Sequence, residues 1–200
     1  MRKLPRIYVI RHGETEWSAT GQHTGGTDVP LTRHGEEQAQ RLHHVLKSVE
    51  FARVLTSPLQ RARRTCELAG YGRVARVEPA LVEWNYGEYE GLTRAEIHQC
   101  HPGWIVFRDG CPGGETPADI ARRADSVVAQ IRNEVGNVAI FSHGHFLCAL
   151  GVRWIGLPIG EGMHFGLNTA SISILGYAHE NVSEPAILMW NGEPELGMVR

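Results

Sequence analysis

Three short segments of the chain combine arginine, histidine, serine or glycine directly after apolar runs. Residues 11–13 read Arg-His-Gly, Ser57 is followed by Arg61 four positions later, and residues 142–144 read Ser-His-Gly. A guanidinium offers a planar set of N–H donors that matches phosphate oxygens, and a neutral imidazole can attack phosphorus. These are the residue types that binding of a compact dianion and transfer of its phosphoryl group require.

The spacing assigns a role to each of these side chains. We expect His12 to be the nucleophile, because it follows the first apolar run on a tight turn. Arg11, Arg61 and His143 then stabilise the charge of the phosphoryl group. A glycine after each histidine, Gly144 in the last segment, lets the backbone turn sharply and approach a ligand closely. A surface position is the simpler interpretation of any one residue, but their shared position after three apolar runs favours a common site.

The departing alkoxide also needs an acid, and residues 81–91 are the best segment for it. This segment contains carboxylates and aromatic rings and ends in glycine. Glu83 lies beside Trp84 and Tyr86, and an apolar setting raises the pKa of a carboxyl so that it keeps its proton near neutrality. Glu83 is therefore the candidate proton donor, with Glu88 and Glu90 as competitors by spacing alone.

Clustered histidines also bind metals, and 11 histidines invite that alternative. His143 and His145 are two positions apart, which on an extended segment directs them to opposite faces. The chain contains no H-E-x-x-H motif, and arginines in the pocket repel a cation. We therefore expect no metal in this site. Surface positions are expected for the other pairs, His43 with His44 and His98 with His101.

The apolar runs at residues 7–10, 54–56 and 138–141 are typical of strands buried on both faces. Helical patterns lie between them, so the sequence predicts an α/β sandwich with a mostly parallel sheet. Ligands of such sheets bind beyond the carboxyl ends of the strands, where the candidate residues lie. A further pair of strands is expected at residues 171–177 and 187–190.

Capping patterns set the starts of the expected helices. Thr32 caps one helix, and Thr116 before Pro117 caps another whose apolar stripe reaches Val135 and which Gly136 ends. Ser57 is expected to cap a third helix, with Pro58 in its first position and Gln60 completing a capping box, up to about Ala69. A last helix is expected at residues 146–155.

Composition bounds the partners of the chain. Its 200 residues, 42% of them apolar, predict one globular domain over residues 1–200. A formal charge of -2 and the absence of a long apolar run argue against nucleic-acid binding and a membrane span. We expect a cytoplasmic protein, with a homodimer as one option for its assembly. Free thiols are expected at Cys66, Cys100, Cys111 and Cys148, because no C-x-x-C pair occurs.

Four blocks of this sequence, taken in order along the chain, resemble the motifs of the histidine phosphatase superfamily. The resemblance is to its phosphoglycerate-mutase-like branch. The resemblance implies a three-layer α/β/α sandwich and covers nearly the full length. The blocks are residues 11–15, 24–25 and 28–32; residues 57–59, 61–62 and 65; residues 83, 86–87 and 90–91; and residues 142–144.

The family implies a phosphohistidine at His12, a phosphate pocket of Arg11, Arg61 and His143, and Glu83 as proton donor. These roles coincide with those assigned above from the chemistry of the side chains. The resemblance also implies that the protein uses no metal and no nucleotide. It places four further residues near the substrate: Ser18, Thr24, Gly25 and Tyr86.

The resemblance favours a phosphatase over a mutase. Monophosphoglycerate mutases of this family carry a longer insertion with a basic patch between the acid block and the last histidine. In this chain the corresponding segment, residues 91–141, is short, and its Arg122-Arg123 pair fits a solvated helix face. Ser18 also stands where mutases often have asparagine. Residues 14–18, 83–87 and 108–111 look like the sedoheptulose-bisphosphatase type, which implies a sugar phosphate or bisphosphate as substrate. Arg108 is then a candidate contact for a second phosphate or for a hydroxyl-rich tail of the substrate. A cofactor-dependent phosphoglycerate mutase and a non-catalytic phospho-ligand module remain the alternatives.

Overall fold

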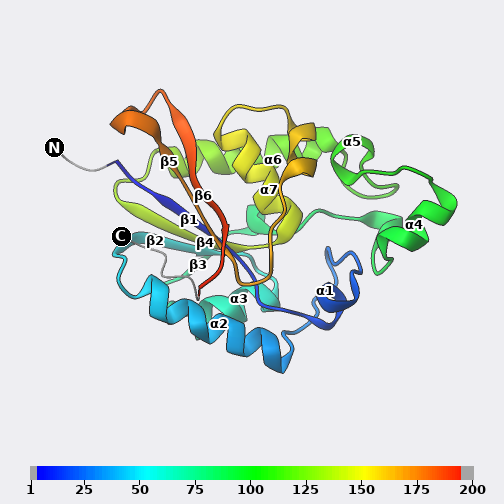
Figure 1. Cartoon of the computed structure of the whole chain (residues 1–200), viewed down its shortest axis with the longest axis horizontal. Helices are drawn as coiled ribbons and strands as arrows, with labels where there is room; N and C mark the ends of the chain where they lie inside the picture. Colours follow the sequence, from blue (N-terminus) through cyan, green and yellow to red (C-terminus); the bar gives the residue numbers. More distant parts are fainter. Residues whose placement is uncertain (1–3, 195–200) are drawn as a thin grey trace.

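The computed structural model describes residues 4–194 and centres on a six-stranded sheet in the order β3-β2-β4-β1-β5-β6 (Figure 1). Strands β3, β2, β4 and β1 are parallel, β5 is antiparallel to β1, and β6 is antiparallel to β5. The mostly parallel sheet and the late pair of neighbouring strands are confirmed. The strands are β1 (Ile7–Arg11), β2 (Phe51–Thr56), β3 (Arg76–Val77), β4 (Asn137–Ser142), β5 (Ile172–Tyr177) and β6 (Pro185–Gly192).

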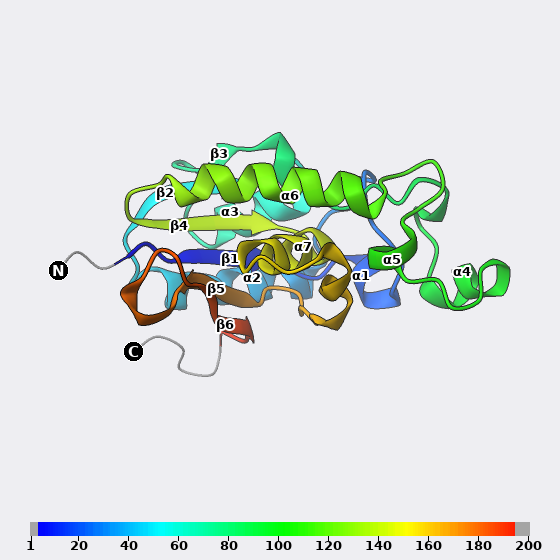
Figure 2. The same cartoon turned by 90° about the horizontal axis from the view of Figure 1, so that it is seen from above.

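Helices cover both faces of this sheet, which gives the three layers that the resemblance implied. Helices α2 and α3 lie on one face, and α6 and α7 lie on the other (Figures 1 and 2). The shorter α1, α4 and α5 lie beyond one end of the strands (Figure 2). The helices are α1 (Glu16–Thr20), α2 (Arg33–Leu46), α3 (Gln60–Leu68), α4 (Arg94–Cys100), α5 (Val106–Asp109), α6 (Pro117–Arg132) and α7 (Gly144–Trp154), with 3₁₀ turns at Pro79–Leu81, Gly87–Tyr89, Ile159–His164 and Ala178–Glu180.

Alternation along β1 explains why its apolar run is unbroken. Ile7 and Val9 join the core cluster beneath α6 and α7, whereas Tyr8 and Ile10 join the cluster beneath α2 and α3. Each fully buried aliphatic side chain of this size stabilises the fold by about 1.5–3 kcal/mol. A strand that is covered on both faces therefore needs apolar residues at every position, and it ends where the first polar side chain, Arg11, appears.

Two of the expected helix starts are confirmed, and one is wrong. Thr32 caps α2, and Thr116 caps α6 through a capping box. Ser57 does not cap α3, which begins only at Gln60. The amide of Gln60 donates to Asp28 Oδ1 at 2.7 Å, and the Gln60 side chain donates back to the Asp28 carbonyl oxygen. A carboxylate from a distant loop thus supplies the cap that a local serine was expected to supply.

Other differences concern ends and short elements. Helix α6 ends at Arg132, so the expected stripe position Val135 lies outside it and is exposed. The short elements β3, α1, α4 and α5 have too few residues for a periodic pattern to be visible in the sequence. The prediction of one domain over residues 1–200 extends beyond the described range at both ends and stays a prediction. No helix within residues 4–194 is long and apolar enough to cross a bilayer.

Candidate active site

The three strand ends expected to meet are neighbours in the sheet, because β4 lies between β2 and β1. The amide of His12 donates to the Ser142 carbonyl oxygen at 3.0 Å, and the amide of Ser57 donates to the Phe141 carbonyl oxygen at 2.9 Å. The imidazole rings of His12 and His143 lie 5.2 Å apart between centroids. Register alone thus brings the two histidines together.

The protonation of His12 leaves one ring nitrogen free for attack on phosphorus. Its Nδ1 lies 2.7 Å from the Gly13 carbonyl oxygen, and a carbonyl can only accept, so Nδ1 carries the proton and Nε2 a lone pair. Burial, followed by the charges of Arg11 and Arg61, lowers the pKa of His12 well below its ordinary value. The imidazole is therefore neutral at pH 7, as a nucleophile must be.

Glycine is required beside His12 by a close approach of two backbones. A Cβ at Gly13 would overlap the Gly35 carbonyl oxygen in the first turn of α2. The amide of Gly13 also donates to Thr65 Oγ1 of α3 at 3.0 Å. The turn that carries His12 is thus fixed against two helices, which restricts the direction of its ring.

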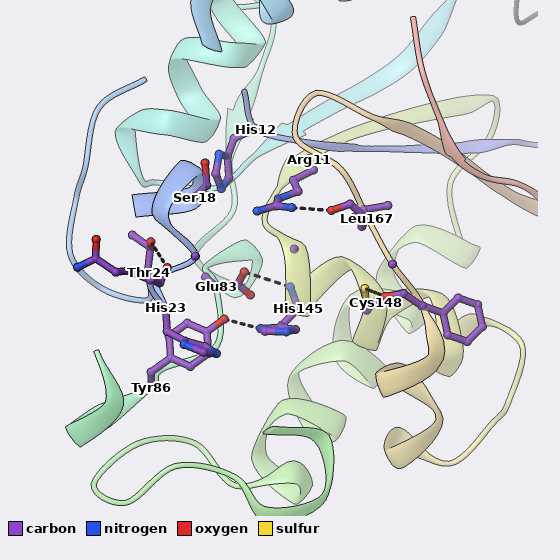
Figure 3. A pocket seen from close by; sticks show the side chains of 15 residues that line it. Arg11, His12, Ser18, His23, Thr24, Glu83, Tyr86, His145, Cys148 and Leu167 are labelled. Atoms are coloured by element: carbon purple, nitrogen blue, oxygen red, sulfur yellow. Dashed lines mark hydrogen bonds between the residues drawn. The ribbon is translucent and has the colours of Figure 1, made fainter. Parts of the chain in front are cut away.

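A cavity of about 300 Å³ lies beyond these strand ends (Figure 3). Arg11 lines it, donates through Nη1 to the Leu167 carbonyl oxygen at 2.5 Å, and has a buried Nε without a hydrogen-bond partner among the described residues. His12 and Glu83 line the same cavity. A guanidinium beside a neutral imidazole gives this end of the cavity a positive charge that suits a phosphoryl group.

Arg61 lies behind the cavity wall and is fully buried. It donates to His143 Nδ1 at 3.1 Å and to the carbonyl oxygens of Thr27 at 2.9 Å, Thr24 at 2.9 Å and Gly25 at 3.0 Å. Four of its five N–H groups are thus used by protein acceptors. We expected Arg61 to form the phosphate pocket with Arg11 and His143. In the structure Arg61 does not line the cavity, and one of its N–H groups is not used by these acceptors.

His143 belongs to the same buried layer. Because Arg61 can only donate, His143 Nδ1 accepts, and Nε2 therefore carries the proton that it donates to Ser57 Oγ at 2.8 Å. Burial, followed by Arg61, lowers the pKa of His143 well below its ordinary value, so the ring is neutral. Ser57, expected to be a helix cap, is instead the acceptor that fixes this ring.

Glu83 is held by three backbone amides, two of them at the start of α7 and one in its own loop. Oε1 accepts from the amides of Trp84 at 2.9 Å and Phe146 at 2.8 Å, and Oε2 accepts from the amide of His145 at 3.1 Å. The partners of the carboxylate are therefore amides instead of the aromatic rings expected from the sequence. Oε2 keeps a lone pair, which can carry a proton toward the cavity.

Arg123 anchors the loop that carries Glu83. Its guanidinium donates to the carbonyl oxygens of Ala80 at 3.0 Å, Val82 at 2.6 Å and Glu83 at 3.1 Å, and it pairs with Glu115. Its side chain is only 15% exposed. The sequence-based placement of the Arg122-Arg123 pair on a solvated face is right for Arg122, which is 74% exposed, and wrong for Arg123.

The residues expected near the substrate divide into two groups. Ser18, Thr24, Tyr86 and Gly144 line the cavity. Gly25 does not line it; its amide donates to Glu90, and its carbonyl accepts from Arg61. Arg108 is also outside, exposed and paired with Asp109, so the structure does not bring it to the expected second phosphate.

Two cavity residues, His23 and His145, were missed by the sequence reasoning. His145 lies in the first turn of α7, so it is not opposite to His143 on an extended segment as expected. Its Nδ1 is 2.5 Å from Tyr86 Oη, and its ring stacks on His23 at 6.0 Å (Figure 3). The Ser-His-Gly-His spacing was the available signal, and recognising a helix start at Gly144 would have revealed it. Within residues 4–194 no three His, Cys, Asp or Glu side chains are grouped to hold a metal.

This arrangement of the strand ends can be compared with known proteins. The model of the histidine phosphatase superfamily, branch 1, matches residues 7–191. The chain belongs to this superfamily. The match includes all the strands described above except Gly192, the last residue of β6, and it confirms the family that the four sequence blocks indicated.

Relatives of this histidine phosphatase include enzymes of several names. An acid phosphatase of Mycobacterium tuberculosis (strain ATCC 25618 / H37Rv) is 43% identical over 194 residues, covering 95% of each chain. Sedoheptulose 1,7-bisphosphatase of Saccharomyces cerevisiae is 31% identical over 248 residues, covering 92% of this chain and 91% of that protein. A solved structure of an open reading frame of Mycobacterium tuberculosis superposes with a TM-score of 0.90 at 41% identity, covering 95% of this chain and 98% of that chain. The protein is a phosphatase, as the sequence predicted.

Proposed function

We propose that this histidine phosphatase hydrolyses monoesters of small phosphorylated metabolites through a phosphohistidine at His12, without a metal ion. The observation that carries the proposal is the tautomer of His12. Its proton is fixed on Nδ1 by the Gly13 carbonyl, so the Nε2 lone pair is available beside the Arg11 guanidinium. A phosphorylated Nε2 would gain charge stabilisation from that guanidinium.

The reaction then has two displacements. Nε2 of His12 attacks phosphorus and the bond to the ester oxygen breaks, while Glu83 gives its proton to the departing alkoxide. In the second displacement, Glu83 takes a proton from water as the water oxygen attacks phosphorus. The bond from phosphorus to Nε2 breaks, and inorganic phosphate and the original imidazole result. One carboxyl serves as acid and then as base, which matches the single carboxylate on the described cavity wall.

The remaining residues orient these groups. Arg11 and the one unused N–H of Arg61 are assigned to the phosphoryl oxygens. His143 fixes the Arg61 Nε, and both of its ring nitrogens are used in hydrogen bonds, so it has no free lone pair with which to compete for the phosphoryl group. Three backbone amides and the Arg123 anchor fix Glu83. The start of α7 lies close to Arg11, since a Cβ at Gly144 would be in ordinary contact with Arg11 Nε at 3.4 Å.

The substrate prediction is a sugar phosphate. The similarity to a sedoheptulose bisphosphatase supports it, and hydroxyl-bearing Ser18, Thr24 and Tyr86 line the cavity. A single phosphate is favoured over a bisphosphate, because Arg108 lies outside the cavity. A cytoplasmic location and the option of a homodimer also stay predictions.

The test is phosphate release by the purified protein and by three variants. His12→Gln should abolish turnover, and the control His44→Gln, an exposed histidine of α2, should not change it. Glu83→Gln also lacks the acid of the first displacement, so this variant is given an ester whose leaving group departs without a proton, such as p-nitrophenyl phosphate. A phosphoprotein that is labile in acid and stable in alkali should then accumulate, because the second displacement lacks its base. Unchanged turnover in His12→Gln would refute the proposal, and loss of activity with EDTA would show that a metal takes part.

A further inference from the structure

A second, smaller chamber adjoins the main cavity on the side away from His12. It has a volume of about 120 Å³ and shares His23, His145 and Phe165 with the main cavity as lining residues. Trp104 and Phe107 form much of its remaining wall. Figure 3 shows His12 and Arg11 on one side of Glu83, and His23, Tyr86 and His145 on the other. The chamber therefore lies where the organic part of a phosphate ester extends, beyond the acid.

The wall of this chamber is a network of aromatic rings in contact. The His23 ring lies 5.3 Å from Trp104 and 4.8 Å from Tyr86, both edge to face. Phe107 contacts the His145 ring edge to face at 5.5 Å. Aromatic rings favour such edge-to-face and offset packing, and a flat ring placed among them gains the same contacts. Linear or branched hydroxylated chains gain much less.

The two histidines of the wall are uncharged near neutral pH. Burial lowers the pKa of His145 to about 4 and also lowers the pKa of His23. His23 Nδ1 donates to the Leu92 carbonyl oxygen at 2.8 Å, so its Nε2 is an acceptor. Among the described residues, Arg94 is the one charged side chain of this lining, and it is exposed. The chamber thus suits an uncharged group.

We propose that the preferred substrate is a phosphomonoester whose organic part ends in a flat, uncharged ring that occupies this chamber. The atoms that join the ring to the phosphate, such as a sugar, then lie in the main cavity between Glu83 and the Tyr86–His145 pair. An apolar cavity of about 150 Å³ accepts a benzene ring. A chamber of about 120 Å³ that adjoins a larger cavity therefore accommodates a single ring or part of a fused one. This inference rests on the proposed function and names its substrate class.

Matched esters isolate the contribution of the ring from the reactivity of the ester. Ribose 5-phosphate and adenosine 5′-monophosphate share the same primary ester on a ribose, and only the second carries a flat aromatic ring. Propyl phosphate and 3-phenylpropyl phosphate form the same comparison without a sugar. We expect kcat/KM to be at least about tenfold higher for the ring-bearing member of at least one pair, since one methylene in an apolar pocket changes kcat/KM by about tenfold or more. A gain below about twofold in both pairs would overturn the inference.

A variant ties the gain to the chamber. Met163 lines the chamber and is 45% exposed, so Met163→Glu adds a carboxylate there with little risk to the fold. Leu188 is also 45% exposed, lies on β6 and lines neither cavity, and Leu188→Glu is the matched control. We expect the kcat/KM ratio of the favoured pair to fall about tenfold in Met163→Glu alone. An unchanged ratio in Met163→Glu, or the same fall in Leu188→Glu, would contradict the assignment.

These outcomes separate this inference from the proposed function. If no ester releases phosphate, the proposed hydrolysis itself is wrong. If all four esters release phosphate and the ring adds nothing, the hydrolysis stands and the ring subsite is rejected. A higher kcat/KM for ribose 5-phosphate than for adenosine 5′-monophosphate, without a gain in the phenylpropyl pair, would favour the plain sugar phosphate predicted from the sequence.

Discussion

Replacement of Arg123 by methionine should separate the stability of the loop that carries Glu83 (the acid loop) from the chemistry of His12. The guanidinium donates from Nε and Nη2 to both oxygens of Glu115, at 2.9 and 2.7 Å, and also to three carbonyls of the acid loop. It lies over the Phe146 ring at 4.5 Å. Arg123→Met keeps much of that apolar contact and removes every one of these hydrogen bonds.

The expected loss of stability follows from burial. The side chains of Arg123 and Glu115 are 15% and 20% exposed, so methionine leaves a largely buried carboxylate without its cation. Removal of one partner of a buried pair costs about 3–5 kcal/mol, and the remaining exposure favours the lower end. The free energy of unfolding should therefore fall by about 3 kcal/mol, which lowers the urea midpoint by about 1 M or more. The folded fraction should also lose about 100-fold in kcat, because Glu83 moves with its loop.

Urea denaturation and phosphate release measure the two effects on the same preparations. The neighbouring Arg122→Met is the control, since Arg122 is mostly exposed and, among residues 4–194, forms an ion pair only with Asp119 in the first turn of α6. The double variant Arg123→Met/Glu115→Gln should recover part of the stability, because no unpaired carboxylate remains. If Arg123→Met equals Arg122→Met in both stability and kcat, the anchoring role is refuted.

Three further predictions concern pH and reaction type. Burial lowers the pKa of His12, His143 and His145, so between those lowered values and pH 6.5 the unfolded chain binds more protons than the folded one. The free energy of unfolding should then fall as the pH drops below about 6.5, by about 1.4 kcal/mol per pH unit for each imidazole. Urea denaturation midpoints at pH 7 and pH 5 test this prediction. A higher midpoint at pH 5 would contradict it. Hydrolysis should persist in mildly acidic solution, because His12 stays neutral there. A plot of kcat/KM against pH should be bell-shaped, with its acid limb well below pH 6.5. An acid limb at pH 6.5 or a flat profile would count against the assigned roles. With a bisphosphoglycerate primer added, phosphate release from phosphoglycerate should remain faster than isomerisation, and the reverse order would identify a mutase.

Sequence reasoning succeeded where a local pattern decides the structure. Unbroken apolar runs located β1, β2 and β4, and the residues after them include His12 and His143, which the register brings together. Thr32 and Thr116 cap helices because the cap and its amide partner are three residues apart. Such signals need no knowledge of the remaining chain.

It failed where the partner of a side chain comes from a distant segment. Asp28 caps α3 from a loop, which leaves Ser57 free to accept from His143. Arg123 reaches carbonyls about 40 residues away in the sequence, and neither charge nor periodicity reveals such partners. His145 was misplaced because the segment after β4 was taken as extended, whereas α7 begins at Gly144.

Because of the hydrogen bonds of Arg61, the two ends of the cavity differ in how freely their residues can be substituted. At the phosphate end, Arg61 and Asp28 bind residues 24–28 to α3 and to His143, so a shift in any of them disturbs the setting of His12. At the opposite end, part of the lining comes from α5 and the segment 159–165, which contact each other locally. An exchange at Ile105 or Met163 alters what fits there and leaves those cross-links intact. The architecture thereby allows substrate selectivity to change while the reacting groups keep their positions.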